Sequence, residues 1–86
     1  MIKIFFRPTF VRQVNKLDED LIEEVHEKIE FFKHKKNHEM LKVHKLHGRF
    51  SNCLSFSVNY KVRIVFEYCS ANEVAFLAIG GHDVYK

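Results

Sequence analysis

The chain has 86 residues, of which 47% are hydrophobic and 29% are charged, and its formal net charge at pH 7 is +3. This length predicts one small domain, spanning residues 1–86, with a single modest core. The longest unbroken apolar run, residues 74–79, is too short to cross a bilayer, and no secretory signal is visible at the N-terminus. We therefore expect a cytoplasmic protein with no membrane partner. Cys53 and Cys69 lack CxxC spacing and are expected to be reduced thiols.

The charges are distributed unevenly along the chain. Between Leu17 and Phe32 there are seven acidic residues and one lysine, whereas the stretch from Lys33 to Arg49 contains six lysines or arginines and one acid. A helix macrodipole accounts for acids at the start of a helix and lysines at its end. It does not account for Lys42, Lys45 and Arg49, which lie beyond the predicted helix. These three residues predict a basic surface for a polyanion.

The first half of the chain predicts a short strand and two helices. Residues 2–6 favour a strand that Pro8 ends, because proline has no amide hydrogen to donate to a ladder. Thr9 is the expected N-cap of a short helix that reaches about Lys16. Asp18 is expected to start a longer helix, whose single apolar stripe consists of Leu17, Leu21, Ile22, Val25, Ile29 and Phe32. Two helices joined this closely predict an antiparallel hairpin.

The second half of the chain predicts a basic loop and then three strands. Residues 37–48 show no clear period, so we expect a loop with at most one turn of helix. The strands cover residues 54–58, 61–68 and 74–79. A three-residue connection that pairs Val58 with Val62 keeps the apolar side chains on one face of the sheet. This register places Ser57 opposite Arg63 and Ser55 opposite Val65.

The order strand, helix, helix and three strands predicts an α+β fold. We expect a small, mainly antiparallel sheet with the helical hairpin packed on its apolar face. Phenylalanine supplies nine of the twelve aromatic residues, so the core is expected to consist largely of phenylalanine. The opposite face of the sheet is expected to be polar and to carry a central arginine.

That arginine, Arg63, is the strongest candidate for a functional residue. The middle of a strand, between Val62 and Ile64, is an unfavourable place for a charge without a partner. One interpretation is structural: the guanidinium pairs with Glu67 or projects into water. The other is functional, because the planar guanidinium fork matches two oxygens of a phosphate.

The histidines and the C-terminal tyrosine are weaker candidates. His82 follows two glycines at the end of the last strand, and it is either solvated or a general acid, since imidazole exchanges its proton near neutral pH. Tyr85 either closes the core or stacks on an unpaired base. Two histidine pairs have the spacing of helix-borne metal ligands, but neither cysteines nor carboxylates cluster with them, so we predict no metal site: His34 with His38, and His44 with His47.

Three segments of the chain resemble one known family. They are Leu46-His47-Gly48, the stretch from Leu54 to Glu67 and the stretch from Ile79 to Tyr85. Together they are similar to the "LxG…YSFSVxYRxRIIFE…IGxHDxVY" pattern of the RelE/ParE superfamily, the toxins of type II toxin–antitoxin modules. The resemblance implies an mRNA interferase, an endoribonuclease that cuts mRNA in the 30S A site without a metal or other cofactor. It also implies a cognate antitoxin as partner, with DNA contacted only indirectly through the antitoxin complex.

The resemblance also implies roles for individual residues. Arg63 matches the phosphate-stabilising arginine, and His82 matches the histidine that assists proton transfer in the YoeB- and YafQ-like branches. Tyr85 matches the terminal aromatic residue that contacts the base or the reacting groups, and His44 falls where those branches place a general base. RelE itself has two lysines where this chain has serines, so a histidine-based site fits better. The expected RNA-binding residues are Lys42, Lys45, His47, Arg49 and Lys61.

Two alternative functions remain open at this point. A ParE-like protein would inhibit DNA gyrase by binding alone, and a catalytically inactive relative would serve within a DNA-binding autoregulatory complex. The fold alone does not distinguish these functions from RNA cleavage, because one fold hosts many functions.

Overall fold

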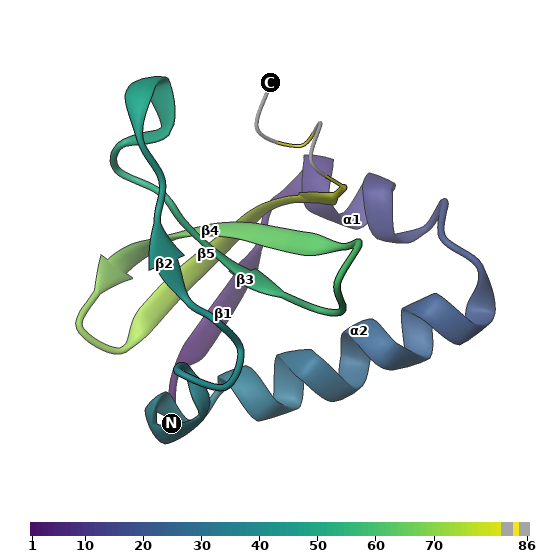
Figure 1. Cartoon of the computed structure of the whole chain (residues 1–86), viewed down its shortest axis with the longest axis horizontal. Helices are drawn as coiled ribbons and strands as arrows, with labels where there is room; N and C mark the ends of the chain where they lie inside the picture. Colours follow the sequence, from purple (N-terminus) through teal and green to yellow (C-terminus); the bar gives the residue numbers. More distant parts are fainter. Residues whose placement is uncertain (82–83, 85–86) are drawn as a thin grey trace.

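The computed structural model describes residues 1–81 and 84, which form one twisted sheet with two helices packed against it (Figure 1). The strands lie in the order β1-β5-β4-β3-β2, with β1 parallel to β5 and every other pairing antiparallel. The elements are β1 (Lys3–Phe6), α1 (Pro8–Val14), α2 (Glu19–Phe32), β2 (His44–Lys45), β3 (Leu54–Ser57), β4 (Arg63–Ser70) and β5 (Glu73–Gly80), with short 3₁₀ turns at Lys35–Asn37 and Gly48–Phe50. The predicted α+β class is confirmed. None of the helices in the described part of the chain is long and apolar enough to cross a membrane.

The register of the β3–β4 hairpin is also as predicted. Ser57 pairs with Arg63, and the Val58 amide donates to the Val62 carbonyl at 2.9 Å. The side chain of Asn59 holds the turn: its Oδ1 accepts hydrogen bonds from the amides of residues 61 and 62 at 2.8 and 2.9 Å. Its Nδ2 donates to Glu24 of α2 at 2.9 Å, so the turn is also tied to the helical layer.

Four phenylalanines with no exposed surface form the centre of the core: Phe32, Phe56, Phe66 and Phe76. The Phe32 ring stacks on Phe56 with a centroid distance of 4.6 Å and meets Phe76 edge-on at 5.4 Å. Phe10 of α1 also reaches Phe76, at 5.4 Å. Because α1 and α2 contact the same ring, both helices pack on one face of the sheet, with α2 returning across it after α1 (Figure 1).

The prediction that Thr9 caps the first helix is wrong, because the N-cap is Arg7. Pro8 occupies the first turn, where its fixed φ suits a helix. An amide hydrogen at this position would have no acceptor within the helix, so its absence costs nothing. The helix therefore begins earlier, and the Thr9 hydroxyl accepts from Nη2 of Arg12 at 3.2 Å instead. Asp18 does cap α2, since its Oδ1 accepts from the Leu21 amide at 2.9 Å.

The prediction of a loop over residues 37–48 is wrong at its far end, where β2 lies. His44 of β2 pairs with Ser55, and Lys45 pairs with Leu54. A strand of two residues is too short to produce a visible alternation, so no periodic signal in the sequence reveals it. The strand places the His44 side chain on the sheet rather than in a loop.

We expect Phe32→Ala to lower the free energy of unfolding by about 3–5 kcal/mol, because it empties the centre of the aromatic core. Phe5 is 42% exposed, and Phe5→Ala serves as the control with an expected loss below about 1 kcal/mol. Urea denaturation followed by circular dichroism measures both values. Equal losses in the two variants would contradict the core described here.

Candidate functional site

The candidate site lies on the face of the sheet that is turned away from the helices. The strand register forms two neighbouring rows of side chains on this face: Ser57, Arg63 and Gly80 in one, and His44, Ser55 and Val65 in the other. Directly paired residues project to the same side of an antiparallel sheet. Arg63 and His44 therefore share this face, two strand spacings apart across the sheet and two residues apart along it, or about 12 Å in total.

Arg63 is only partly buried, but its Nη1 atom is buried and has no hydrogen-bond partner within the described residues. The ion pair with Glu67, one of the two structural interpretations, does not form; the one ion pair in residues 1–81 and 84 joins Lys33 to Glu30. A buried donor without an acceptor is uncommon in proteins and unfavourable in energy. The residue as a whole is partly exposed, and an anion that reached the guanidinium would supply the missing acceptor.

Val84 contacts this face beside the end of β5. A Cβ atom added to Gly80 would lie 3.3 Å from the Cβ of Val84, and the Val84 amide donates to the Gly81 carbonyl at 3.0 Å. Gly80 pairs with Arg63, so Val84 lies on the Arg63 side of the sheet. The predicted catalytic residues His82 and Tyr85 lie outside the described residues.

His44 is exposed, and two contacts hold its ring at the edge of this face. Its Nδ1 lies 2.8 Å from the Lys42 carbonyl oxygen, and its Nε2 lies 3.4 Å from Oγ of Ser55. Ser55 is polar, yet its side chain has no exposed surface. The face is therefore only partly open to water, since Val65 beside Ser55 is buried as well.

The expected RNA-binding residues surround β2 and the β3–β4 turn and do not share one face. Lys45 follows His44 in β2 and pairs with Leu54, so it projects from the opposite side of the sheet. Lys61 is exposed in the β3–β4 turn, two residues before Arg63. The remaining three lie in the connections that flank β2: Lys42, His47 and Arg49.

The histidine pairs lie apart from any metal-binding cluster in the described part of the chain. No group of three His, Cys, Asp or Glu side chains that could hold a metal ion occurs within residues 1–81 and 84. The helical spacing of His34 and His38 is not realised, because α2 ends at Phe32. The His38 ring instead stacks on Phe32 at 4.4 Å, with its Nε2 2.8 Å from the Phe32 carbonyl oxygen.

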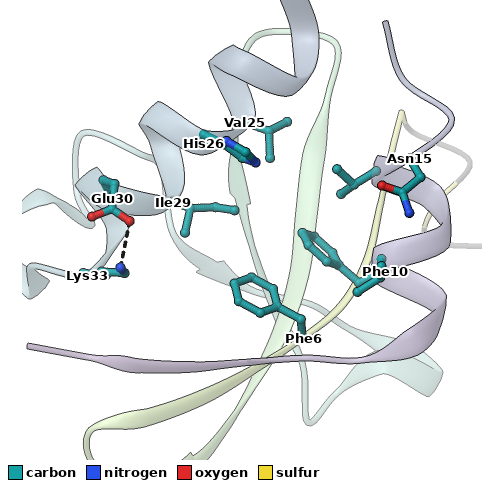
Figure 2. Close-up of a pocket in the computed structure, with 10 residues that line it drawn as sticks. Phe6, Phe10, Asn15, Val25, His26, Ile29, Glu30 and Lys33 are labelled. Atoms are coloured by element: carbon teal, nitrogen blue, oxygen red, sulfur yellow. Dashed lines mark hydrogen bonds and ion pairs between the residues drawn. The ribbon is translucent and has the colours of Figure 1, made fainter. Parts of the chain in front are cut away.

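A second surface lies on the helical side of the molecule (Figure 2). It is a groove of about 530 Å³ between α1 and α2. Its ionisable lining groups are His26 and the pair formed by Glu30 and Lys33, which Figure 2 shows along α2 and its end. Its walls are otherwise largely apolar: Phe6, Phe10, Val11, Val14, Val25 and Ile29. This lining is suited to contact with another apolar surface and offers little for catalysis.

Comparisons with known proteins identify the fold. No family-level sequence model and no curated protein matches the chain. A chain of the YoeB–YefM complex from Staphylococcus aureus has a TM-score of 0.72 at 16% identity, with 95% of this chain and 98% of that chain covered. The toxin–antitoxin complex RelBE2 from Mycobacterium tuberculosis gives 0.70 at 18% identity, covering 94% and 98%. A conserved hypothetical protein from Helicobacter pylori gives 0.71 at 20% identity, covering 96% and 97%. The chain therefore has the fold of the RelE and YoeB toxins, as the resemblance predicted.

The thiol of Cys53, directly before β3, provides a test of the electrostatics on the polar side of the sheet. Burial, and to a lesser extent the Glu67 carboxylate, raises the pKa of the Cys53 thiol above its usual value. We therefore expect slow alkylation of Cys53 by iodoacetamide at pH 8 in a Cys69→Ser background, because little thiolate is present. Adding Glu67→Gln removes the smaller cause, lowers the thiol pKa and should speed alkylation by less than about tenfold. An unchanged or slower rate in the Glu67→Gln protein would contradict this contribution.

Proposed function

We propose that this protein is the toxin of a type II toxin–antitoxin module and that it cleaves mRNA by internal transesterification. The observation that carries the proposal is Arg63, a half-buried guanidinium on the polar face whose buried Nη1 donor is without a partner among the described residues. A phosphodiester supplies acceptor oxygens that match the guanidinium fork. The fold shared with RelE and YoeB toxins supports the same class of protein.

The proposed reaction transfers the phosphorus within the RNA. The 2′-OH of one nucleotide loses its proton and attacks the adjacent phosphorus, and the bond from phosphorus to O5′ breaks. The products are a 2′,3′-cyclic phosphate and a 5′-OH. The enzyme must therefore align the 2′-oxygen with the leaving oxygen, accept one proton, supply another and stabilise the extra negative charge on the phosphorane.

The residues of this chain can be given these tasks. Arg63 stabilises the phosphorane charge, and His44 accepts the proton of the 2′-OH. His82 donates a proton to O5′, and Tyr85 stacks on a base, in keeping with the sequence resemblance. His44 and Arg63 project from the same face of the sheet, which supports their acting on one phosphodiester.

The proposed partners are mRNA in the 30S A site and a cognate antitoxin, with DNA contacted only through the antitoxin complex. Two of the similar structures are themselves toxin–antitoxin complexes, which supports an antitoxin as partner. An antitoxin that laid a helix or strand over the polar face would cover Arg63 and inhibit cleavage. The proposed location is the cytoplasm, where ribosomes translate mRNA.

We expect Arg63→Ala to reduce the cleavage rate of a translated message by about 10²–10³-fold, because it removes the main donor to the phosphorane. Arg63→Lys should restore little of this rate, since an ammonium lacks the planar fork. Primer-extension (toeprint) analysis of purified protein with translating ribosomes measures the rates. Arg12→Ala is the matched control, because it removes an exposed guanidinium from α1 on the other face of the sheet.

The same assay with His82→Ala tests the proton-transfer role. Undiminished cleavage in both Arg63→Ala and His82→Ala would overturn the proposed function. If the protein inhibits gyrase supercoiling and this inhibition survives His82→Ala, a ParE-like binding function would replace the proposed RNA-cleaving function.

The contact between Gly80 and Val84 can be tested in the same assay. In Gly80→Val the new side chain would meet Val84 and push that residue away from the strand, because even a Cβ at this position lies 3.3 Å from the Val84 Cβ. We expect the cleavage rate to fall by up to about 100-fold. Val84→Ala in the same protein removes two methyl groups from the contact and should restore part of the rate. Full activity of the single Gly80→Val variant would show that the position of Val84 is not needed for cleavage.

A further inference from the structure

The backbone that leads into β2 contains one extra residue. The Leu41 carbonyl accepts a hydrogen bond from the Ser57 amide at 2.9 Å, and His44 pairs with Ser55. One residue lies between the two contact positions on β3, whereas two residues lie between Leu41 and His44. The extra residue lies where the turn of residues 38–43 enters β2, since the amides of Lys42 and Val43 donate to Glu39 and His38 within that turn. We call this irregularity the Lys42 bulge, because two residues stand opposite one, as in the β-bulges that re-aim side chains at sheet edges.

Lys42 is the residue of the bulge that departs from the regular ladder. Its φ is 60°, and it is the one non-glycine residue with positive φ in the described part of the chain. This left-handed conformation is unfavourable for a side chain with a Cβ atom. In a regular ladder the Lys42 carbonyl would accept the Ser57 amide. Because Leu41 accepts that amide instead, the Lys42 carbonyl is available, and it lies 2.8 Å from Nδ1 of His44.

This contact determines which ring nitrogen of His44 carries the hydrogen. A carbonyl oxygen only accepts hydrogen bonds, so Nδ1 is the donor and Nε2 keeps its lone pair in the neutral ring. Nε2 faces the hydroxyl of Ser55 at 3.4 Å, on the side of the sheet that carries Arg63. Imidazole that is free in water favours the opposite tautomer, with the hydrogen on Nε2, so the bulge imposes the less common form.

We propose that the Lys42 bulge is a positioning device that holds His44 in the Nδ1–H tautomer, so that Nε2 accepts the proton of the substrate 2′-OH. The inference rests on the proposed function and adds a residue to its machinery. Lys42 acts here through its backbone carbonyl, independently of any contact between its ammonium group and RNA. A strained conformation at a non-glycine residue is typical of positions where the surrounding structure and the function depend on it.

The tautomer can be read directly in the isolated protein. In long-range ¹H–¹⁵N correlation spectra of the histidine-labelled full chain, recorded with the ring neutral, we expect a proton-bearing Nδ1 and a lone-pair Nε2 for His44. Lys42→Gly and Lys42→Asn should keep this pattern, because both residues adopt the left-handed conformation readily. Lys42→Val should shift the population toward Nε2–H, since a β-branched residue strongly disfavours the left-handed conformation.

All three variants remove the same ammonium group, so a difference between them reports the backbone alone. If Lys42→Val does not fold, Lys42→Ala provides the milder comparison with Lys42→Gly. An Nε2–H tautomer in the unmodified protein would overturn the proposal. Identical tautomers in the glycine variant and in the folded valine or alanine variant would overturn it equally.

Cleavage of a translated message at saturating mRNA then tests the consequence. We expect kcat for Lys42→Val to be at least about tenfold below that of Lys42→Gly, within the range that a positioned general base contributes. Equal kcat values despite different tautomers would overturn the positioning role. The spectra need no RNA, so an unmodified protein with the expected tautomer that cleaves no mRNA would contradict the proposed function and leave the bulge assignment intact.

Discussion

The register of the β3–β4 hairpin decides which side of the sheet each later residue occupies. The turn closes at Val58 and Val62, and Arg63 is the first residue of β4. Side chains alternate along a strand, so a slip of one residue would direct Arg63 toward the buried phenylalanines and Ile64 away from them. Burying an unpaired charge among aromatic rings costs far more than the slip could regain. The hydrophobic core and the position of the guanidinium are therefore consequences of one constraint.

The local chemistry of the turn reinforces that constraint. Asn59 satisfies two amides of the turn with one oxygen and reaches Glu24 of α2 with its nitrogen. A shifted turn would lose all three hydrogen bonds, each worth about 0.5–1.5 kcal/mol. The two edges of the site are then added from distant parts of the chain. The bulge at Lys42 brings His44 from one side, and Val84 contacts Gly80 on the other.

Much of this arrangement could be predicted from the sequence, because apolar alternation and helical spacing report directly on burial. The Ser57–Arg63 register follows from keeping apolar residues on one face, and Asp18 is recognisable as a helix cap from its residue type. The true start of α1 was obscured by Thr9, a good capping residue that stands beside the more decisive Pro8. Strand β2 has only two residues, and its bulge is defined by hydrogen bonds to a strand more than ten positions away. A lysine also gives no sign of a left-handed backbone, which glycine or asparagine would have indicated.

The low net charge of the chain is a poor guide to what an RNA phosphate would experience at the site. The acids of α2, such as the exposed Glu23 and Glu27, belong to the helical layer, whereas Arg63 and His44 project from the far side of the sheet. Packed layers are separated by about 10 Å, which is close to one Debye length at 0.1 M salt. The exposed acids lie on the outer side of the helical layer, beyond this distance, so salt weakens their repulsion of a phosphate on the polar face. A phosphate on that face would instead respond to the nearby guanidinium, whose buried Nη1 donor lacks a partner within the described residues, so the local field and not the total charge of +3 governs binding there.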